Sequence, residues 1–107
     1  MATTEKETQT FATFREFYPF YLREHLNVTC RRLHFAGSSL VLGVVLAALL
    51  SGDLRWLIAA PFAGYGFAWI GHYFFEHNRP ATFKHPLYSF IGDWAMYRDT
   101  LSGKIKF

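Results

Sequence analysis

Two long apolar runs dominate the pattern of hydrophobic and polar positions along the chain. The first extends from Leu33 to Leu50, and His34 is its only ionisable residue. The second extends from Trp56 to Phe75, and His72 is its only ionisable residue. A helix of the first run's length is about 27 Å long, which is close to the thickness of a bilayer's hydrocarbon core. Each run therefore predicts a membrane-spanning helix.

A short polar link, SGDLR at 51–55, joins the two runs and is typical of a turn between adjacent helices. We therefore predict an all-α fold built on a membrane helical hairpin, with spans at about 33–51 and 55–77. The alternative is a soluble bundle in which both helices are buried. A chain of 107 residues has little material left to cover two helices that are apolar all round, and this favours the membrane.

Amphipathic helices are predicted on both sides of the hairpin. Aromatic residues recur every three or four positions between 11 and 22, and Pro19 predicts a break within that helix. Pro86 is suited to open a last helix, and Gly103 to end it. The apolar face of this last helix suits a membrane interface, and it consists of Leu87, Phe90, Ile91, Trp94 and Tyr97. We expect residues 1–10 to be a disordered polar lead-in and residues 11–107 to form a single helical membrane domain.

Composition and charge narrow the classes of function. The net charge is +3, and the Lys and Arg residues gather outside the hairpin turn, which predicts an integral membrane protein with both termini cytoplasmic. No basic helix or aromatic-interleaved basic patch is present, which argues against nucleic acid as a partner. Cys30 is the only cysteine, so an intrachain disulfide and a Cys-based zinc site are excluded.

The histidines occupy related positions on the predicted hairpin. If the turn is centred on Asp53, His34 and His72 lie at the same depth on the two helices. His25 can join them if the chain turns between residues 27 and 29. Small residues form ridges that let membrane helices approach closely, namely Ser39, Gly43 and Ala47 on the first span and Ala60, Gly64 and Ala68 on the second. These ridges would be buried either between the two spans or in a homodimer.

Polar residues gather where the second run ends, in GHYFFEHNRPA at 71–81. Ionisable residues at the edge of an apolar span are costly and usually functional. Imidazole and carboxylate groups together suit iron, zinc, copper or nickel. The alternative is a rim of interface anchors that bind no metal. The motifs of zinc proteases, serine hydrolases and phosphate-binding loops are absent from the sequence.

Two separated stretches resemble one small membrane family. They are FYLREHLNVTCRRLHFAG at 20–37 and GHYFFEHNRPATFKHPLYSFIGD at 71–93, which agree with the family in both order and spacing. The family is that of the 2-hydroxy fatty acid dioxygenases, which act in the conversion of phytosphingosine to odd-numbered fatty acids. The resemblance implies a membrane-bound dioxygenase that uses Fe(II) and O₂ and shortens a 2-hydroxy fatty acid by one carbon.

The resemblance also implies roles for individual residues. His25, His34 and His72 match the family's histidines and are expected to be the metal ligands. Asn27, Glu76 and Arg79 match its other polar positions, and we expect them to contribute to catalysis. Glu76 could replace one histidine as a ligand, while Arg79, Arg31 or Arg32 could pair with the substrate's carboxylate. His77 and His85 stand where the family has other residues, so we expect both to be surface histidines.

Three hypotheses about function follow. The first is an Fe(II)-dependent dioxygenase of 2-hydroxy fatty acids. The second is a non-enzymatic membrane hairpin that organises lipids or protein partners through its interfacial helices. The third is a metal-dependent lipid hydrolase, which would work without oxygen.

Overall fold

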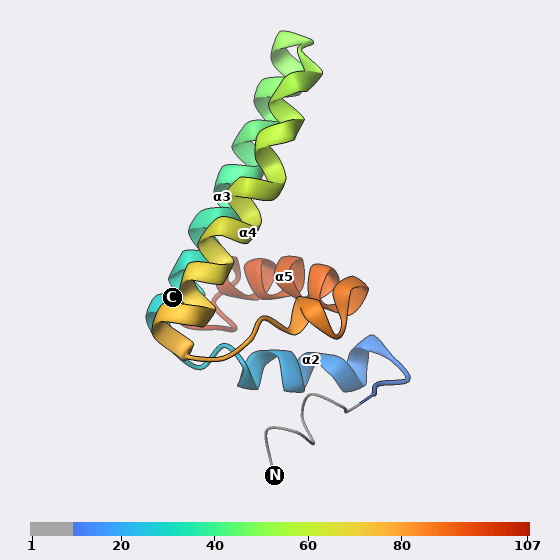
Figure 1. The fold of residues 1–107 in the computed structure, drawn as a ribbon, viewed down its shortest axis with the longest axis vertical. Helices are drawn as coiled ribbons and strands as arrows, with labels where there is room; N and C mark the ends of the chain where they lie inside the picture. The colour runs from blue at the N-terminus through green and yellow to red at the C-terminus, as the bar shows by residue number, and fades with distance from the viewer. Residues whose placement is uncertain (1–9) are drawn as a thin grey trace.

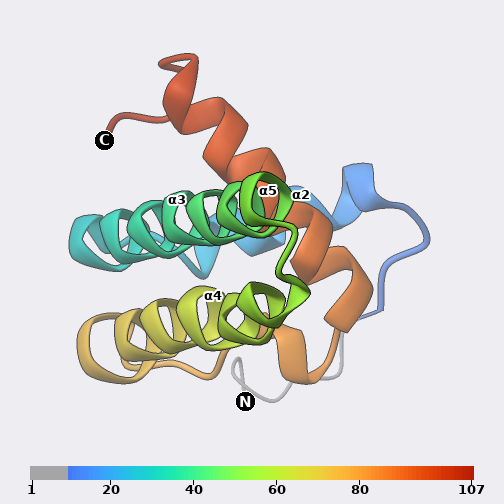
Figure 2. The same ribbon diagram turned by 90° about the horizontal axis from the view of Figure 1, so that it is seen from above.

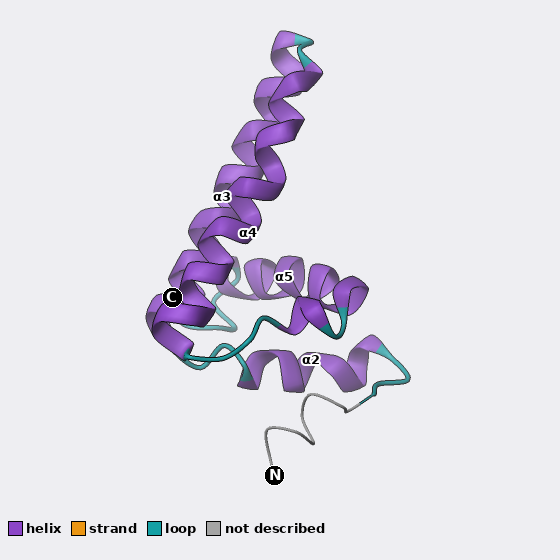
Figure 3. Cartoon of the chain, viewed as in Figure 1, coloured by secondary structure: helices purple, strands orange, loops and turns teal. Residues whose placement is uncertain are grey.

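The computed structural model describes residues 10–107, and within that range all regular structure is helical (Figures 1 and 3). The elements in chain order are α2 (Phe14–Arg23), α3 (Val28–Ser51), η1 (Leu54–Ile58), α4 (Ala59–Ile70), η2 (Gly71–Glu76), η3 (Ala81–Phe83) and α5 (Pro86–Leu101). The predicted all-α class is therefore confirmed for these residues. Almost all of the predicted lead-in, residues 1–10, lies outside the described residues.

Helices α3 and α4 lie side by side and form the long arm of the molecule (Figures 1 and 2). Two glycines, Gly37 in α3 and Gly71 in η2, let α3 come close to α4 and η2, because a side chain at either position would collide with the facing segment. A Cβ atom on Gly37 would come within 3.0 Å of the Phe67 Cβ atom. A Cβ atom on Gly71 would come within 3.2 Å of the Cys30 Cα atom, which cannot rotate away. Both close contacts lie toward the end of the arm that carries the histidines.

The predicted pair of small-residue ridges is only partly found. Gly64 contacts the first span, since a Cβ atom there would lie 3.3 Å from Val41. Gly43 has no neighbour within 4 Å of such an atom, and the hydroxyl of Ser39 instead bonds to that of Tyr97 at 2.8 Å. The buried stripe of α3 consists of Cys30, His34, Gly37, Val44 and Ala48. Ser39 and Gly43 therefore do not form the surface on which α4 packs.

The second predicted span, residues 55–77, is not one continuous α-helix. It consists of a 3₁₀-helix (η1), an α-helix (α4) and a π-helix (η2). Pro61 lies in the first turn of α4, where its missing N–H removes a donor and favours a change of helix type. By length and composition, α3 is the one helix within residues 10–107 that could cross a membrane. Two membrane spans therefore stay a prediction.

Helices α2 and α5 lie across one end of the arm, and we call these two helices the base (Figure 1). Thr13 caps α2, which continues through Pro19, so the break expected at this proline is wrong. Proline has no backbone N–H, so Pro19 cannot donate a hydrogen bond to the carbonyl of Arg15 within the helix. Both residues are exposed. The small core of the base consists of Phe17, Phe20, Tyr21, Ala81 and Met96.

Helix α5 begins at Pro86, as predicted, and Gly103 follows it with a positive φ of 86°. Its buried face consists of the small and polar residues Ser89, Gly92, Ala95 and Asp99 and one large apolar residue, Met96. Gly92 allows α2 to approach, because a Cβ atom there would lie 2.9 Å from the Tyr21 ring. The apolar residues Leu87, Phe90 and Ile91 are exposed. This helix therefore presents an apolar surface outward.

The contact at Gly71 leads to a prediction about stability. Gly71→Ala should lower the free energy of unfolding by about 1–3 kcal/mol, because the new methyl group forces η2 away from Cys30. Gly66→Ala is the matched control in the adjacent helix α4. No atom lies within 4 Å of a Cβ at Gly66, so this change should be neutral or stabilise by up to about 1 kcal/mol. Thermal unfolding in detergent, followed by circular dichroism, measures both. Equal stability of the two variants would contradict the close contact.

Candidate metal centre

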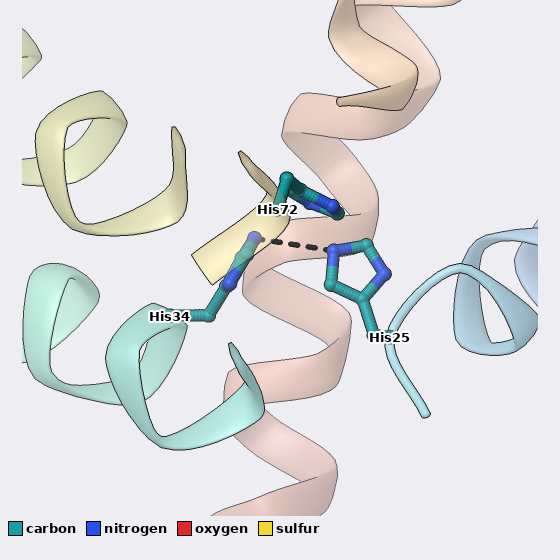
Figure 4. A group of neighbouring side chains, drawn as sticks. All are labelled: His25, His34 and His72. Carbon is teal, nitrogen blue, oxygen red and sulfur yellow. Dashed lines mark hydrogen bonds between the residues drawn. The ribbon is translucent and has the colours of Figure 1, made fainter. Parts of the chain in front are cut away.

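Three histidines from three different segments meet at the junction of the arm and the base (Figure 4). His25 lies between α2 and α3, His34 lies in α3, and His72 lies in η2. The ring of His25 is 4.5 Å from each of the other two, and the rings of His34 and His72 are 4.9 Å apart. Their exposed fractions are 1%, 6% and 2%, respectively. The convergence predicted from equal depth and from the turn after His25 is therefore observed.

Each of these imidazoles has an oxygen acceptor at its Nδ1 atom. The Nδ1–H of His25 donates to the backbone carbonyl of Tyr21 at 2.6 Å. The Nδ1–H of His34 donates to the backbone carbonyl of Cys30 at 2.9 Å. The Nδ1–H of His72 donates to the side-chain oxygen of Asn78 at 2.6 Å. Since these oxygens can only accept, all three rings carry a proton on Nδ1.

The remaining nitrogen, Nε2, is then unprotonated in each neutral ring. The Nε2 atoms of His25 and His34 are 3.1 Å apart, so two lone pairs face each other without a proton between them. Burial, together with the neighbouring His34 and His72, holds the pKa of His25 well below its usual range, which favours the neutral form. One potential ligand atom from each ring lies within 4.8 Å of the others. The cluster is thus arranged to surround a cation with three nitrogen ligands.

The side chain of Asn78 orients His72, and no pattern in the sequence identified this role. The chain reverses at His77, which has a left-handed φ of 59°, and the backbone N–H of Asn78 donates to the carbonyl of His72 at 3.0 Å. The Asn78 amide group also donates to the backbone carbonyl of Glu24 at 3.1 Å, which fixes its oxygen toward His72. His72 and Asn78 are six residues apart, which is not a spacing that brings two side chains together on one face of a helix. Only the turn-forming character of Asn78 after an apolar run could have suggested it.

Tyr21 is a second supporting residue that the sequence analysis did not place in the site. Its ring stacks on His25 at 4.1 Å, and its backbone carbonyl accepts the proton of the same imidazole. The Tyr21 hydroxyl donates to the carboxylate of Asp93. Burial raises the pKa of Tyr21 well above its usual range and raises the pKa of Asp93 to about 6. Helix α5 therefore braces the residue that holds His25.

Asn27 and Glu76 lie beside the cluster and join the helices that carry it. The Asn27 side chain caps α3 by accepting from the N–H of Cys30 at 3.0 Å. The backbone N–H of Asn27 donates to the Glu76 carboxylate, and its amide group donates to the carbonyl of Phe75 at 3.3 Å. The group of mutually close ligand atoms consists of the three histidines and does not include Glu76. Both residues tie the start of α3 to the end of η2.

The other residues predicted near the site lie around it. Arg79 is exposed, and its guanidinium group stacks over the Phe83 ring at 5.5 Å. His77 is exposed at the end of η2. His85 is half-buried against Phe11, Phe17 and Phe20, with ring centroids 5.2–6.0 Å away. His85 is therefore a packing residue of the base rather than a freely exposed one.

The chemistry of the donor set fits a transition metal. Three neutral imidazoles suit iron, zinc, copper or nickel and leave coordination positions for other molecules. Hydrogen bonds to the outer nitrogens fix the orientation of the rings, as is usual around metal sites. The three histidines therefore form a candidate metal centre whose ion their geometry alone does not specify.

Comparison with known proteins adds one finding to this geometry. No curated protein and no solved structure shows significant similarity to the chain. A family model described as 2-hydroxy-palmitic acid dioxygenase Mpo1-like matches residues 11–105. The match covers the two stretches at 20–37 and 71–93, all three clustered histidines and nearly the whole described fold. With these residues inside one continuous match, the chain belongs to the Mpo1-like family of 2-hydroxy-palmitic acid dioxygenases.

Proposed function

We propose that this protein is an Fe(II)-dependent dioxygenase that shortens 2-hydroxy fatty acids by one carbon at a membrane surface. The observation that carries the proposal is the set of three Nδ1–H donors, which leaves one unprotonated nitrogen on each ring, in a cluster where one potential ligand atom from each of His25, His34 and His72 lies within 4.8 Å of the others. The family name supports the reaction class and the type of substrate.

Iron suits this centre for a chemical reason. Three protein nitrogens leave room for the carboxylate and the hydroxyl of a 2-hydroxy acid, and for dioxygen. When bound, the iron would supply a site at which the acid and O₂ meet and at which O₂ is activated. The overall change balances without another reductant. The bond between C1 and C2 breaks, C2 becomes a carboxyl group, C1 leaves as CO₂, and O₂ accepts four electrons and also yields water.

We assign supporting roles to the polar residues around the centre. Asn27 and Glu76 are positioning residues, because they hold the start of α3 against η2 and so keep His34 beside His72. Arg79 lies outside the histidine cluster, where its positive charge is available to attract a carboxylate. The hydrogen bond from His72 to Asn78 holds this ring in the tautomer that leaves Nε2 free.

The exposed surface supports a membrane location. Large apolar side chains are exposed along the arm, including Leu49 at 73%, Leu50 at 79% and Phe62 at 76%. A surface of this kind is costly in water and favourable in a bilayer. We propose that α3 and the segment 54–76 both cross the membrane, with both termini cytoplasmic. Helix α5 would then lie in the interface through Leu87, Phe90 and Ile91.

The first test is the metal content of protein purified anaerobically in detergent. Wild type should hold about one iron per chain, and His34→Ala and His72→Ala should each lose it, because a centre with two protein ligands binds weakly. His77→Asn is the control, since it removes an exposed histidine outside the cluster and Asn tolerates the left-handed backbone there. Helical content by circular dichroism shows whether the variants fold. Folded wild type without metal would refute the proposed centre and favour a non-enzymatic membrane hairpin.

The second test is turnover. Iron-loaded protein should convert 2-hydroxy-palmitate to the acid one carbon shorter, with one O₂ consumed per molecule, as measured by mass spectrometry and an oxygen electrode. Palmitate should not react, because without the hydroxyl it offers a single ligand group. His72→Ala should abolish turnover, while His77→Asn should retain it. Hydrolysis of a lipid ester in the absence of oxygen would instead support a metal-dependent hydrolase.

A third test concerns Asn78 as a positioning residue. Asn78→Ala should weaken iron binding by about 10–100-fold, because His72 loses the acceptor that orients it. Asn78→Asp should restore most of the affinity, since a carboxylate oxygen can accept the same proton. Competition with a chelator measures both constants. Equal affinities of the Ala and Asp variants would show that the acceptor at this position does not tune the centre.

A further inference from the structure

A cavity of about 670 Å³ lies beside the histidine cluster but is separate from it. The end of α2, the turn after η2 and the segment around η3 form its walls. None of the three clustered histidines lines it, whereas Asn78, which holds His72, does. A molecule in this cavity could therefore contact Asn78, which bonds to His72, without touching the proposed metal ligands.

The charges in the cavity favour an anion. Three cations, Arg23, Arg79 and Lys84, line it from different segments. Within residues 10–107, the ion pairs join Arg55 to Asp53 and Arg98 to Asp99, so these three cations have no carboxylate partner in that range. The two acidic residues of the wall are already engaged. Glu76 accepts from the backbone of Asn27, and Glu24 has a partner of its own.

An exposed aromatic strip leads from the cavity along α4. Phe83 lines the cavity and lies under the guanidinium group of Arg79. Its ring is 5.5 Å from that of Trp69, and the ring of Trp69 is 6.0 Å from that of Tyr65. These three residues, Phe83, Trp69 and Tyr65, form what we call the aromatic strip. All three are partly exposed, so a hydrocarbon chain could lie against them.

We propose that the cavity and the aromatic strip together bind a lipid anion. Its carboxylate or phosphate head lies between Arg79 and Lys84, and its hydrocarbon chain lies along the strip toward the membrane. Arg and Lys together offer charge-assisted hydrogen bonds to such a head. The proposal rests on the proposed function for the membrane setting and extends it, because it gives lipid anions a binding site outside the metal centre.

The test uses the full chain, freed of metal by a chelator and held in neutral detergent at mildly alkaline pH. The probe is stearic acid brominated in mid-chain, because bromine quenches tryptophan fluorescence on contact. The acid should quench Trp69, and Trp69→Phe should remove that saturable quenching. The double variant Arg79→Gln, Lys84→Gln should weaken binding by about tenfold or more. Arg15→Gln, an exposed change on α2 outside the cavity, should leave binding unchanged.

Two further probes decide what is recognised. Brominated stearyl alcohol should bind much more weakly than the acid. Equal binding of acid and alcohol, or full binding by the folded double variant, would overturn the proposal even if the protein holds iron and turns over its substrate. Brominated phosphatidylglycerol distinguishes the two sources of the anionic head. Tighter binding of this lipid than of the acid would assign the site to membrane phospholipid, and the reverse would assign it to free fatty acid. Because the protein is metal-free, failure of the iron centre leaves this result unaffected.

Discussion

The mutual repulsion of three buried imidazole lone pairs is the constraint on which the arrangement of this molecule depends. Hydrogen bonds from Nδ1 of His25, His34 and His72 leave no proton for the 3.1 Å gap between two of the Nε2 atoms. Burial prevents water from compensating freely, and buried polar groups without partners are costly. A metal ion bound by the three rings would relieve this cost, and that relief would contribute to its binding energy. The surrounding fold has to resist the alternative, in which the three rings rotate apart.

Several contacts provide that resistance, and they come from α2, the start of α3, η2 and α5. Gly71 lets η2 approach Cys30 closely, which brings His72 to the level of His34. The contacts of Asn27 with Glu76 and Phe75 lock the same two segments together. Tyr21, held by Asp93 of α5, braces His25 from below. Helices from both the arm and the base therefore hold the cluster together.

Sequence patterns predicted the parts of this design that depend on regular helices. His34 and His72 could be paired because equal distances from a turn at Asp53 imply equal depth. The residues that bond to the histidines were harder to predict from the sequence. Asn78 reaches His72 because the chain forms a π-helix and then reverses at His77, a left-handed residue, and no regular helical spacing describes this path. Pro61 and Pro19 have different effects on the helices that contain them. The former separates helix types within a predicted single span, whereas the latter is accommodated on the exposed side of α2. Rules based on the position of a proline in the sequence cannot distinguish these two cases, because the packing around each proline decides whether the helix continues.

The position of the cluster at the junction of arm and base has an energetic consequence for a lipid substrate. Moving a hydrocarbon chain from a bilayer into water costs about 0.8 kcal/mol per CH₂ group, or on the order of 10 kcal/mol for a palmitoyl chain. A centre deep in a water-soluble domain would have to recover that cost by burying the whole chain in a pocket. In the proposed orientation, the histidines lie at the depth of the lipid head groups, while Leu49, Leu50 and the rest of the far arm lie in the hydrocarbon core. The acid group can then reach the metal while its chain stays in the membrane. In this proposal, a chain of 107 residues would act on a long-chain acid without a large binding tunnel of its own.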